Sequence, residues 1–287
     1  MVPEMNYFSP LTIEEAVSLL HTQKDSRILA GGTDIISGIR LESSRFTNVA
    51  SLIDINGIEE IRQIIETDNS VTIGANTTFA EITGSAVCRE LYPALVEAAS
   101  QVGSPQIRNR ATIAGNFVNN APCADSVPSL LVYDATITVA STEGTKEMPL
   151  AEFLLRPYKT QLKADELVTK ITLKKLPETY RSSFYKLGRR RAVVISRITI
   201  CLLGEQKDGI ITDIRIATGA ATPIGKRVTG VEVFLTGKPV SDDLFREAGV
   251  MLGKYILDTT GLRWSTPYKL PVAQNLCYQG LSKLFSK

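Results

Sequence analysis

The stretch Arg27-Ile-Leu-Ala-Gly-Gly-Thr-Asp34 decides how the first part of the chain folds. A short apolar run, typical of a buried strand, stands directly before two glycines, a hydroxyl and a carboxylate. Glycine allows positive φ angles and lets a bound anion approach backbone N–H groups closely. The spacing differs from the dinucleotide pattern G-x-G-x-x-G, so two explanations remain open: an anion-binding loop, or a turn in which the glycines serve only conformation.

A second stretch, Thr112-Ile-Ala-Gly-Asn116, has too many small and amide residues for a simple core strand. Its first and last side chains offer hydrogen bonds, and we expect the N–H groups around Ala114 and Gly115 to cradle a phosphate. Asp125 follows nearby as an acceptor for a ribose hydroxyl. An Asx-type turn between elements is the competing explanation. Together the two stretches fit a ligand with two phosphates and no metal.

The remaining pattern predicts an α+β chain. Helical periodicity behind a Thr12 cap covers residues 11–20, a second helix is expected over 91–102, and strand patterns occur at 26–30, 48–54, 70–75 and 135–140. After a soft boundary at Leu176-Pro177, the pattern becomes antiparallel, and a helical tail starts at Ser241. We therefore expect a larger domain over 1–176, divided near residue 57, and a smaller domain over 177–287.

Composition excludes several classes of function. The 287 residues include 32 basic and 30 acidic side chains, which gives no argument for a nucleic-acid or membrane partner. Four scattered cysteines and one histidine leave no cluster of metal ligands. No apolar run approaches the ~20 residues of a membrane span, and the N-terminus lacks a signal-peptide pattern. We expect a reduced, cytoplasmic protein.

Taken in order, these stretches resemble the FAD subunits of the xanthine dehydrogenase and carbon monoxide dehydrogenase family. The resemblance rests on Ala30-Gly-Gly-Thr-Asp34, Gln106-Ile-Arg-Asn109 and Thr112-Ile-Ala-Gly-Asn116. Through Gln101-Val-Gly-Ser-Pro-Gln-Ile-Arg-Asn109 it is nearest to subunits of bacterial nicotinate and purine hydroxylases. It covers nearly the whole chain and implies a two-part FAD-binding domain followed by a smaller α+β C-terminal domain.

The resemblance implies a set of contacts to the FAD pyrophosphate. These contacts fall on Arg27, Ile28, Leu29, Ala30, Gly31, Gly32, Thr33, Asp34, Thr112, Ile113, Ala114, Gly115 and Asn116. It also implies a backbone contact at Gly103 and an acidic residue of the adenosine side at Asp125. Ala114 stands where the family usually has glycine, so a positive φ there would cost on the order of 1 kcal/mol.

Four further positions carry over from the family. Val168 matches an apolar neighbour of adenine, Lys186 a basic residue near the flavin, and Ile195 a residue packed by the isoalloxazine; Lys159 is a further contact. The resemblance implies non-covalent FAD, no catalytic acid–base residue and no metal in this chain. It also implies a large molybdenum-cofactor partner, a small partner with [2Fe–2S] clusters, and NAD or another final acceptor.

Two other functions remain open. A stand-alone flavin oxidase would need its own substrate base and often a covalent flavin link, for which the single histidine, His21, stands far from the glycine loops. A flavin-free nucleotide-binding scaffold is favoured only by Ala114. The basic triplet Arg189-Arg-Arg191 is either a solvated turn or a site that binds phosphate or the edge of a partner subunit.

Overall fold

The N-terminal end of the chain is a small parallel sheet covered by a helix. The computed structural model describes residues 4–190 and 193–286. Its first sheet has the order β1-β3-β2, with β1 (Asn6–Phe8), β3 (Ser51–Asp54) and β2 (Ser26–Leu29) parallel. Helix α1 (Ile13–Thr22) begins after Thr12, whose side chain accepts a hydrogen bond from the Glu15 N–H, as the capping pattern predicts. Helix α2 (Ile35–Arg40) follows β2 directly.

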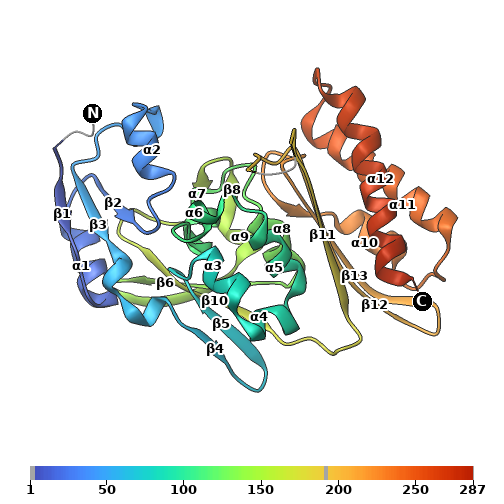
Figure 1. Ribbon diagram of the computed structural model, residues 1–287, viewed down its shortest axis with the longest axis horizontal. Coiled ribbons are helices and arrows are strands. Elements are labelled where there is room, and N and C mark those ends of the chain that lie inside the picture. Colours follow the sequence, from blue (N-terminus) through green and yellow to red (C-terminus); the bar gives the residue numbers. More distant parts are fainter. Residues whose placement is uncertain (1–3, 191–192, 287) are drawn as a thin grey trace.

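A five-stranded sheet forms the middle of the molecule (Figure 1). Its antiparallel strands have the order β4 (Ile64–Glu66), β5 (Ser70–Gly74), β10 (Leu167–Lys174), β6 (Thr136–Ser141) and β7 (Gly144–Pro149). Short 3₁₀ turns at Ile55–Gly57 and Glu59–Ile61 connect it to the first sheet, and a third, Ser44–Phe46, lies between α2 and β3. The small pair β8 (Leu154–Arg156) and β9 (Lys159–Thr160) lies beside it.

Seven short helices accompany this sheet. They are α3 (Phe79–Gly84), α4 (Ala86–Leu91), α5 (Pro93–Ser100), α6 (Pro105–Arg108), α7 (Ile113–Asn119), α8 (Ser126–Val132) and α9 (Leu150–Phe153). The single helix expected over 91–102 is wrong at its start. Pro93 disfavours a helical Tyr92 and has no N–H to continue the α4 ladder, so α4 ends and α5 begins there.

The C-terminal part is a four-stranded antiparallel sheet with a helical cover. Strands β11 (Arg181–Leu187), β12 (Ile198–Lys207), β13 (Ile210–Gly219) and β14 (Lys226–Arg227) follow in sequence order, as the antiparallel pattern predicts. Helices α10 (Thr229–Leu235), α11 (Asp242–Thr260) and α12 (Thr266–Phe285) complete the chain, and Figure 1 shows α11 and α12 side by side along this sheet. The predicted α+β class is confirmed.

One apolar core joins the two sides of the predicted boundary. Phe184 and Cys201 of the C-terminal sheet pack into the same buried cluster as Leu130 of α8. At the edge of this contact, Asp134 pairs with Arg215 and Arg227 at 2.9 and 2.6 Å. The division into two domains at residue 176 therefore stays a prediction. In the folded chain, residues on both sides of this boundary pack into one apolar core. Among the described residues, no helix is long and apolar enough to cross a membrane.

Candidate cofactor site

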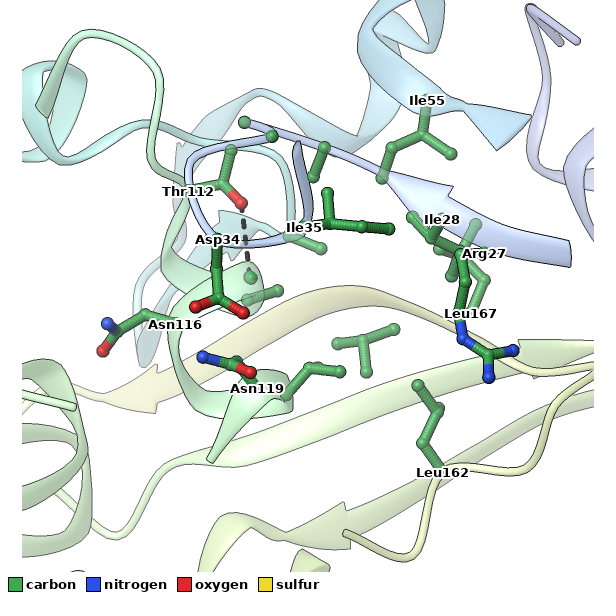
Figure 2. A pocket seen from close by; sticks show the side chains of 18 of the residues that line it. Arg27, Ile28, Asp34, Ile35, Ile55, Thr112, Asn116, Asn119, Leu162 and Leu167 are labelled. Atoms are coloured by element: carbon green, nitrogen blue, oxygen red, sulfur yellow. Dashed lines mark hydrogen bonds between the residues drawn. The ribbon is translucent and has the colours of Figure 1, made fainter. Parts of the chain in front are cut away.

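The two stretches singled out in the sequence meet at one cavity of about 340 Å³. Its walls come from the loop between β2 and α2, from the start of α7, and from residues 162–168 at the start of β10 (Figure 2). The cavity thus lies between the first sheet and the central sheet. A concave, mostly apolar space with a few converging polar groups is the usual form of a small-molecule site.

Gly31 brings the two stretches together. A β-carbon at this position would lie 2.0 Å from the Arg110 carbonyl oxygen and 2.9 Å from the Ala111 Cα, so only glycine permits this approach of two backbones. Gly32 has a φ of 74° and takes the left-handed region. Both glycines therefore have a conformational role, and both also line the cavity. The two explanations left open by the sequence are compatible.

The first loop presents a row of backbone donors. In the described part of the chain, no N–H from Gly31 to Ile35 donates to a backbone carbonyl, although all five residues line the cavity. Backbone N–H groups are strong donors that nearly always find a partner when buried. Successive N–H groups in a turn of this kind form a concave site for an anion. This loop is suited to phosphate oxygens.

The second stretch contributes less through its backbone than expected. Residues from Ile113 onward are helical, and the Ala114 N–H donates to the Ala75 carbonyl at 3.2 Å. The Gly115 N–H donates to Thr112 Oγ1, also at 3.2 Å. These two N–H groups are engaged within the protein, which corrects the expectation that they cradle a phosphate. The Thr112 hydroxyl accepts this bond and keeps its own hydrogen for a ligand.

Ala114 carries no backbone strain. It does not belong to the residues of positive φ, and its side chain is buried in the core. The cost considered for alanine at this position therefore does not arise.

A residue that the sequence did not single out contacts two wall residues at the polar end of the cavity. Arg45 pairs with Asp34 at 3.0 Å and donates to Asn119 Oδ1 at 2.8 Å. Its guanidinium stacks between the rings of Phe46 and Tyr158, at 4.8 and 4.5 Å from their centres. No local pattern marks Arg45, because three of its four partners, Asp34, Asn119 and Tyr158, lie in separate segments of the chain. Asn116 lies at the same end in Figure 2.

The other end of the cavity is mainly apolar. Figure 2 shows Ile28, Ile55, Leu162 and Leu167 around it, with the predicted contact Arg27 at the same end, and Val168 is a further wall residue. A flat apolar ring such as adenine fits a compartment of this kind, whereas charged groups fit the opposite end. The predicted residues Leu29 and Ile113 are not among the wall residues; Ile113 is fully buried.

Gly103 and Lys186 lie elsewhere, at a second cavity of about 630 Å³, and Asp125 pairs with Lys186. Gly103 and Lys186 line it. The buried Lys186 ammonium is 2.6 Å from Asp125 Oδ2 and 2.7 Å from the Gln101 carbonyl oxygen. Ser196 donates a further hydrogen bond to Asp125. Burial raises the pKa of Asp125, and the charge of Lys186 opposes this. The ribose acceptor expected at Asp125 is thus paired with the lysine expected near the flavin.

The last predicted contacts lie on surface segments. Ile195 is 75% exposed in the connection between β11 and β12. Lys159 is exposed in β9, and its carbonyl accepts from the Asn120 side chain at 3.0 Å. The basic triplet ends at Arg191, which lies outside the described residues. No cluster of three or more His, Cys, Asp or Glu able to hold a metal occurs in the described ranges.

Comparison with known proteins assigns the chain. Residues 3–176 match the model for the FAD binding domain in molybdopterin dehydrogenase, and residues 183–284 match the carbon monoxide dehydrogenase flavoprotein C-terminal domain. The nicotinate dehydrogenase FAD-subunit of Eubacterium barkeri is 32% identical over 95% of this chain and 93% of its own. The carbon monoxide dehydrogenase medium chain of Hydrogenophaga pseudoflava is 28% identical over 99% of this chain and 98% of its own.

A solved structure agrees with these relatives. Carbon monoxide dehydrogenase from Hydrogenophaga pseudoflava, in a form lacking the Mo-pyranopterin moiety, superposes with a TM-score of 0.92, at 26% identity, over 100% of this chain and 99% of that one. The fold and the family predicted from the sequence are thereby confirmed. The chain belongs to the oxidoreductase family of FAD-binding medium subunits of molybdopterin dehydrogenases.

Proposed function

We propose that this chain is the electron-relay subunit of a molybdenum hydroxylase complex. In this proposal, a large partner with the molybdenum cofactor oxidises the substrate, and a small partner passes the electrons through [2Fe–2S] clusters. This chain takes them on non-covalent FAD and hands them to NAD or another acceptor. The observation that carries the proposal is the cavity at Gly31, where a row of free backbone donors adjoins an apolar compartment.

The residues of the cavity fit FAD in two ways. The N–H groups of the loop 31–35 and the Thr112 hydroxyl would hold the two phosphates, since they are donors without competing acceptors. The apolar walls at Ile28, Leu167 and Val168 would take the adenine. Bound FAD would supply the redox chemistry; the chain would supply binding, orientation and charge balance.

Arg45 and Lys186 provide the charge balance in this proposal. Arg45 neutralises the Asp34 carboxylate, which otherwise repels a phosphate at the polar end. Lys186 stays buried because Asp125 pairs with it, and it lies toward the second cavity, where we place the flavin side of the cofactor. Lys159 and Ile195 remain proposed contacts at the surface.

The two alternatives receive less support. The single histidine, His21, stands in the last turn of α1 and is exposed, so it gives a stand-alone oxidase no substrate base and no covalent flavin link at this cavity. A flavin-free scaffold was favoured only by Ala114, and the helical φ of this residue removes that argument.

The proposal is tested by purifying the tagged full-length chain from its native host. We expect a yellow eluate that contains large and small partners, iron, molybdenum and FAD that acid releases. A flavin that stays bound after acid precipitation would favour the oxidase. A colourless chain without partners would refute the proposal and favour the scaffold.

A further inference from the structure

Three cations gather where α11 connects to α12. Arg197, Arg263 and Lys269 have no carboxylate partner among the described residues, whereas Arg227, for example, pairs with Asp134 at 2.6 Å. Burial lowers the pKa of Lys269, and the positive charges of Arg197 and Arg263 lower it further. The Lys269 ammonium has one long hydrogen bond, 3.4 Å to a backbone carbonyl. Uncompensated positive charge of this kind is relieved by an acidic partner.

Large apolar side chains stand exposed between these cations. Leu262 is 86% exposed, Trp264 81% and Tyr268 53%. The Arg197 guanidinium lies 5.4 Å from the centre of the Trp264 ring. Trp, Tyr and Arg are the residues that contribute most to protein–protein binding, and exposed apolar groups ringed by charge mark interaction sites. We call the six residues the basic corner: Arg197, Leu262, Arg263, Trp264, Tyr268 and Lys269.

The basic corner lies next to Pro122, which follows helix α7 of the candidate cofactor site. A hollow of about 240 Å³ beneath it is lined by Arg263, Lys269, Pro122, Pro157 and Ala220. The Ala220 N–H donates to the Pro122 carbonyl at 2.8 Å, and the Ala220 carbonyl accepts from Lys269. Pro122 comes shortly after α7, whose start lines the cavity. In Figure 1 the α11–α12 connection lies at the end of these helices opposite the C-terminus.

We infer that the basic corner docks an acidic surface of the partner subunit that delivers electrons to this chain. The inference rests on the proposed function. A small anion would leave Trp264 and Leu262 in water, so a protein surface accounts for more of the exposed groups. The iron–sulfur partner is favoured over the molybdenum subunit because Arg197 directly follows Ser196, which donates a hydrogen bond to Asp125. Asp125 pairs with Lys186 at the second cavity, where the proposed function places the flavin, and electron transfer needs its two redox groups close together.

The first test uses the wild-type complex. A carbodiimide joins an amine to a carboxylate without a spacer, so it reports a contact between Lys269 and an acidic side chain. We expect peptide mapping to find Lys269 linked to an Asp or Glu of the iron–sulfur subunit. Links from Lys269 to the molybdenum subunit alone, or no link, would overturn the inference.

The second test reverses the charge. The variant Arg263→Glu/Lys269→Glu is compared with Lys24→Glu/Lys207→Glu, which reverses two exposed lysines outside the basic corner. Iron per chain after gel filtration at increasing salt measures retention of the partner. We expect the first variant to bind the partner about tenfold or more weakly, with the control like wild type. Trp264→Ala should also weaken binding, but with the salt dependence of wild type.

The outcomes separate the inference from the proposed function. Flavin absorbance and circular dichroism show whether each variant is folded. If folded Arg263→Glu/Lys269→Glu and Trp264→Ala retain iron as wild type does, the inference is wrong and the proposed function stands. If the wild-type preparation contains no iron–sulfur partner, both are wrong.

Discussion

Replacing Gly31 with alanine tests the packing of the two loops. The new β-carbon would lie 2.0 Å from the Arg110 carbonyl oxygen, whereas ordinary contacts begin near 3.4 Å, so the loops must separate by about 1.4 Å. The neighbour is backbone on both sides and has no rotamer to change. Overpacking of this kind costs about 1–3 kcal/mol. A separation of this size also displaces the N–H groups from Gly31 to Ile35, so FAD affinity should fall with stability.

The assay compares Gly31→Ala with Gly84→Ala, because a β-carbon at Gly84 meets nothing within 4 Å. Urea unfolding of the flavin-free proteins should show a lower free energy of unfolding for Gly31→Ala but not for Gly84→Ala. A flavin fluorescence titration should show that Gly31→Ala binds FAD at least tenfold more weakly, which corresponds to about 1.4 kcal/mol of binding free energy. If the flavin-free Gly31→Ala protein is as stable as the control, the loop contact is not the reason for this glycine. The reasoning would be refuted entirely if both its stability and its Kd matched those of Gly84→Ala.

Three further predictions follow from single side chains. Arg45→Ala should weaken FAD binding about fivefold in the same titration, with Arg45→Lys in between, because lysine keeps the charge but not the two-ring stacking; equal Kd values would contradict the role given to Arg45. Ala114→Gly should lower stability to urea by about 1 kcal/mol without changing the Kd, since glycine costs entropy in a helix; a tighter Kd would show that the position needs glycine. In thiol titration of the native protein, only the partly exposed Cys123 should react, faster as pH rises above 9, because burial and the charge of Asp125 raise its pKa and delay the thiolate. Burial raises the pKa of Cys277 to about 12, and reaction of this thiol before unfolding would contradict its burial.

Those parts of the candidate site that depend on residues close together in the sequence could be predicted. Gly31 and Thr112 stand in runs whose composition marks a loop and a cap, and both line the cavity. Strand and helix periodicity likewise predicted β2, α1 and the antiparallel C-terminal strands. These features depend on neighbours within about ten residues, which a pattern in one sequence contains.

Contacts between distant segments were not predictable in the same way. Arg45 reaches Asp34 and Asn119 through the tertiary fold, and nothing in its own surroundings distinguishes it from a solvated arginine. The pairing of Asp125 with Lys186 joins residues 61 positions apart. The sequence identified both as candidates but not that they bind each other. The free N–H groups of the first loop could not be predicted either, since the absence of a partner depends on where the surrounding carbonyl groups lie in the fold.

A cofactor bound in the cavity would also hold the first sheet against the central sheet. Its walls come from the first sheet through Ile28 and from the central sheet through Val168, and the loop after β2 contacts the segment before α7 at Gly31. A ligand held between them therefore ties the first sheet to the rest of the chain. A ligand at 100 times its Kd stabilises the binding-competent state by about 2.7 kcal/mol. This is comparable to the cost assigned to Gly31→Ala, so bound FAD can mask a weakened loop contact. The flavin-free protein is consequently the form in which the contribution of Gly31 to the fold is measured directly.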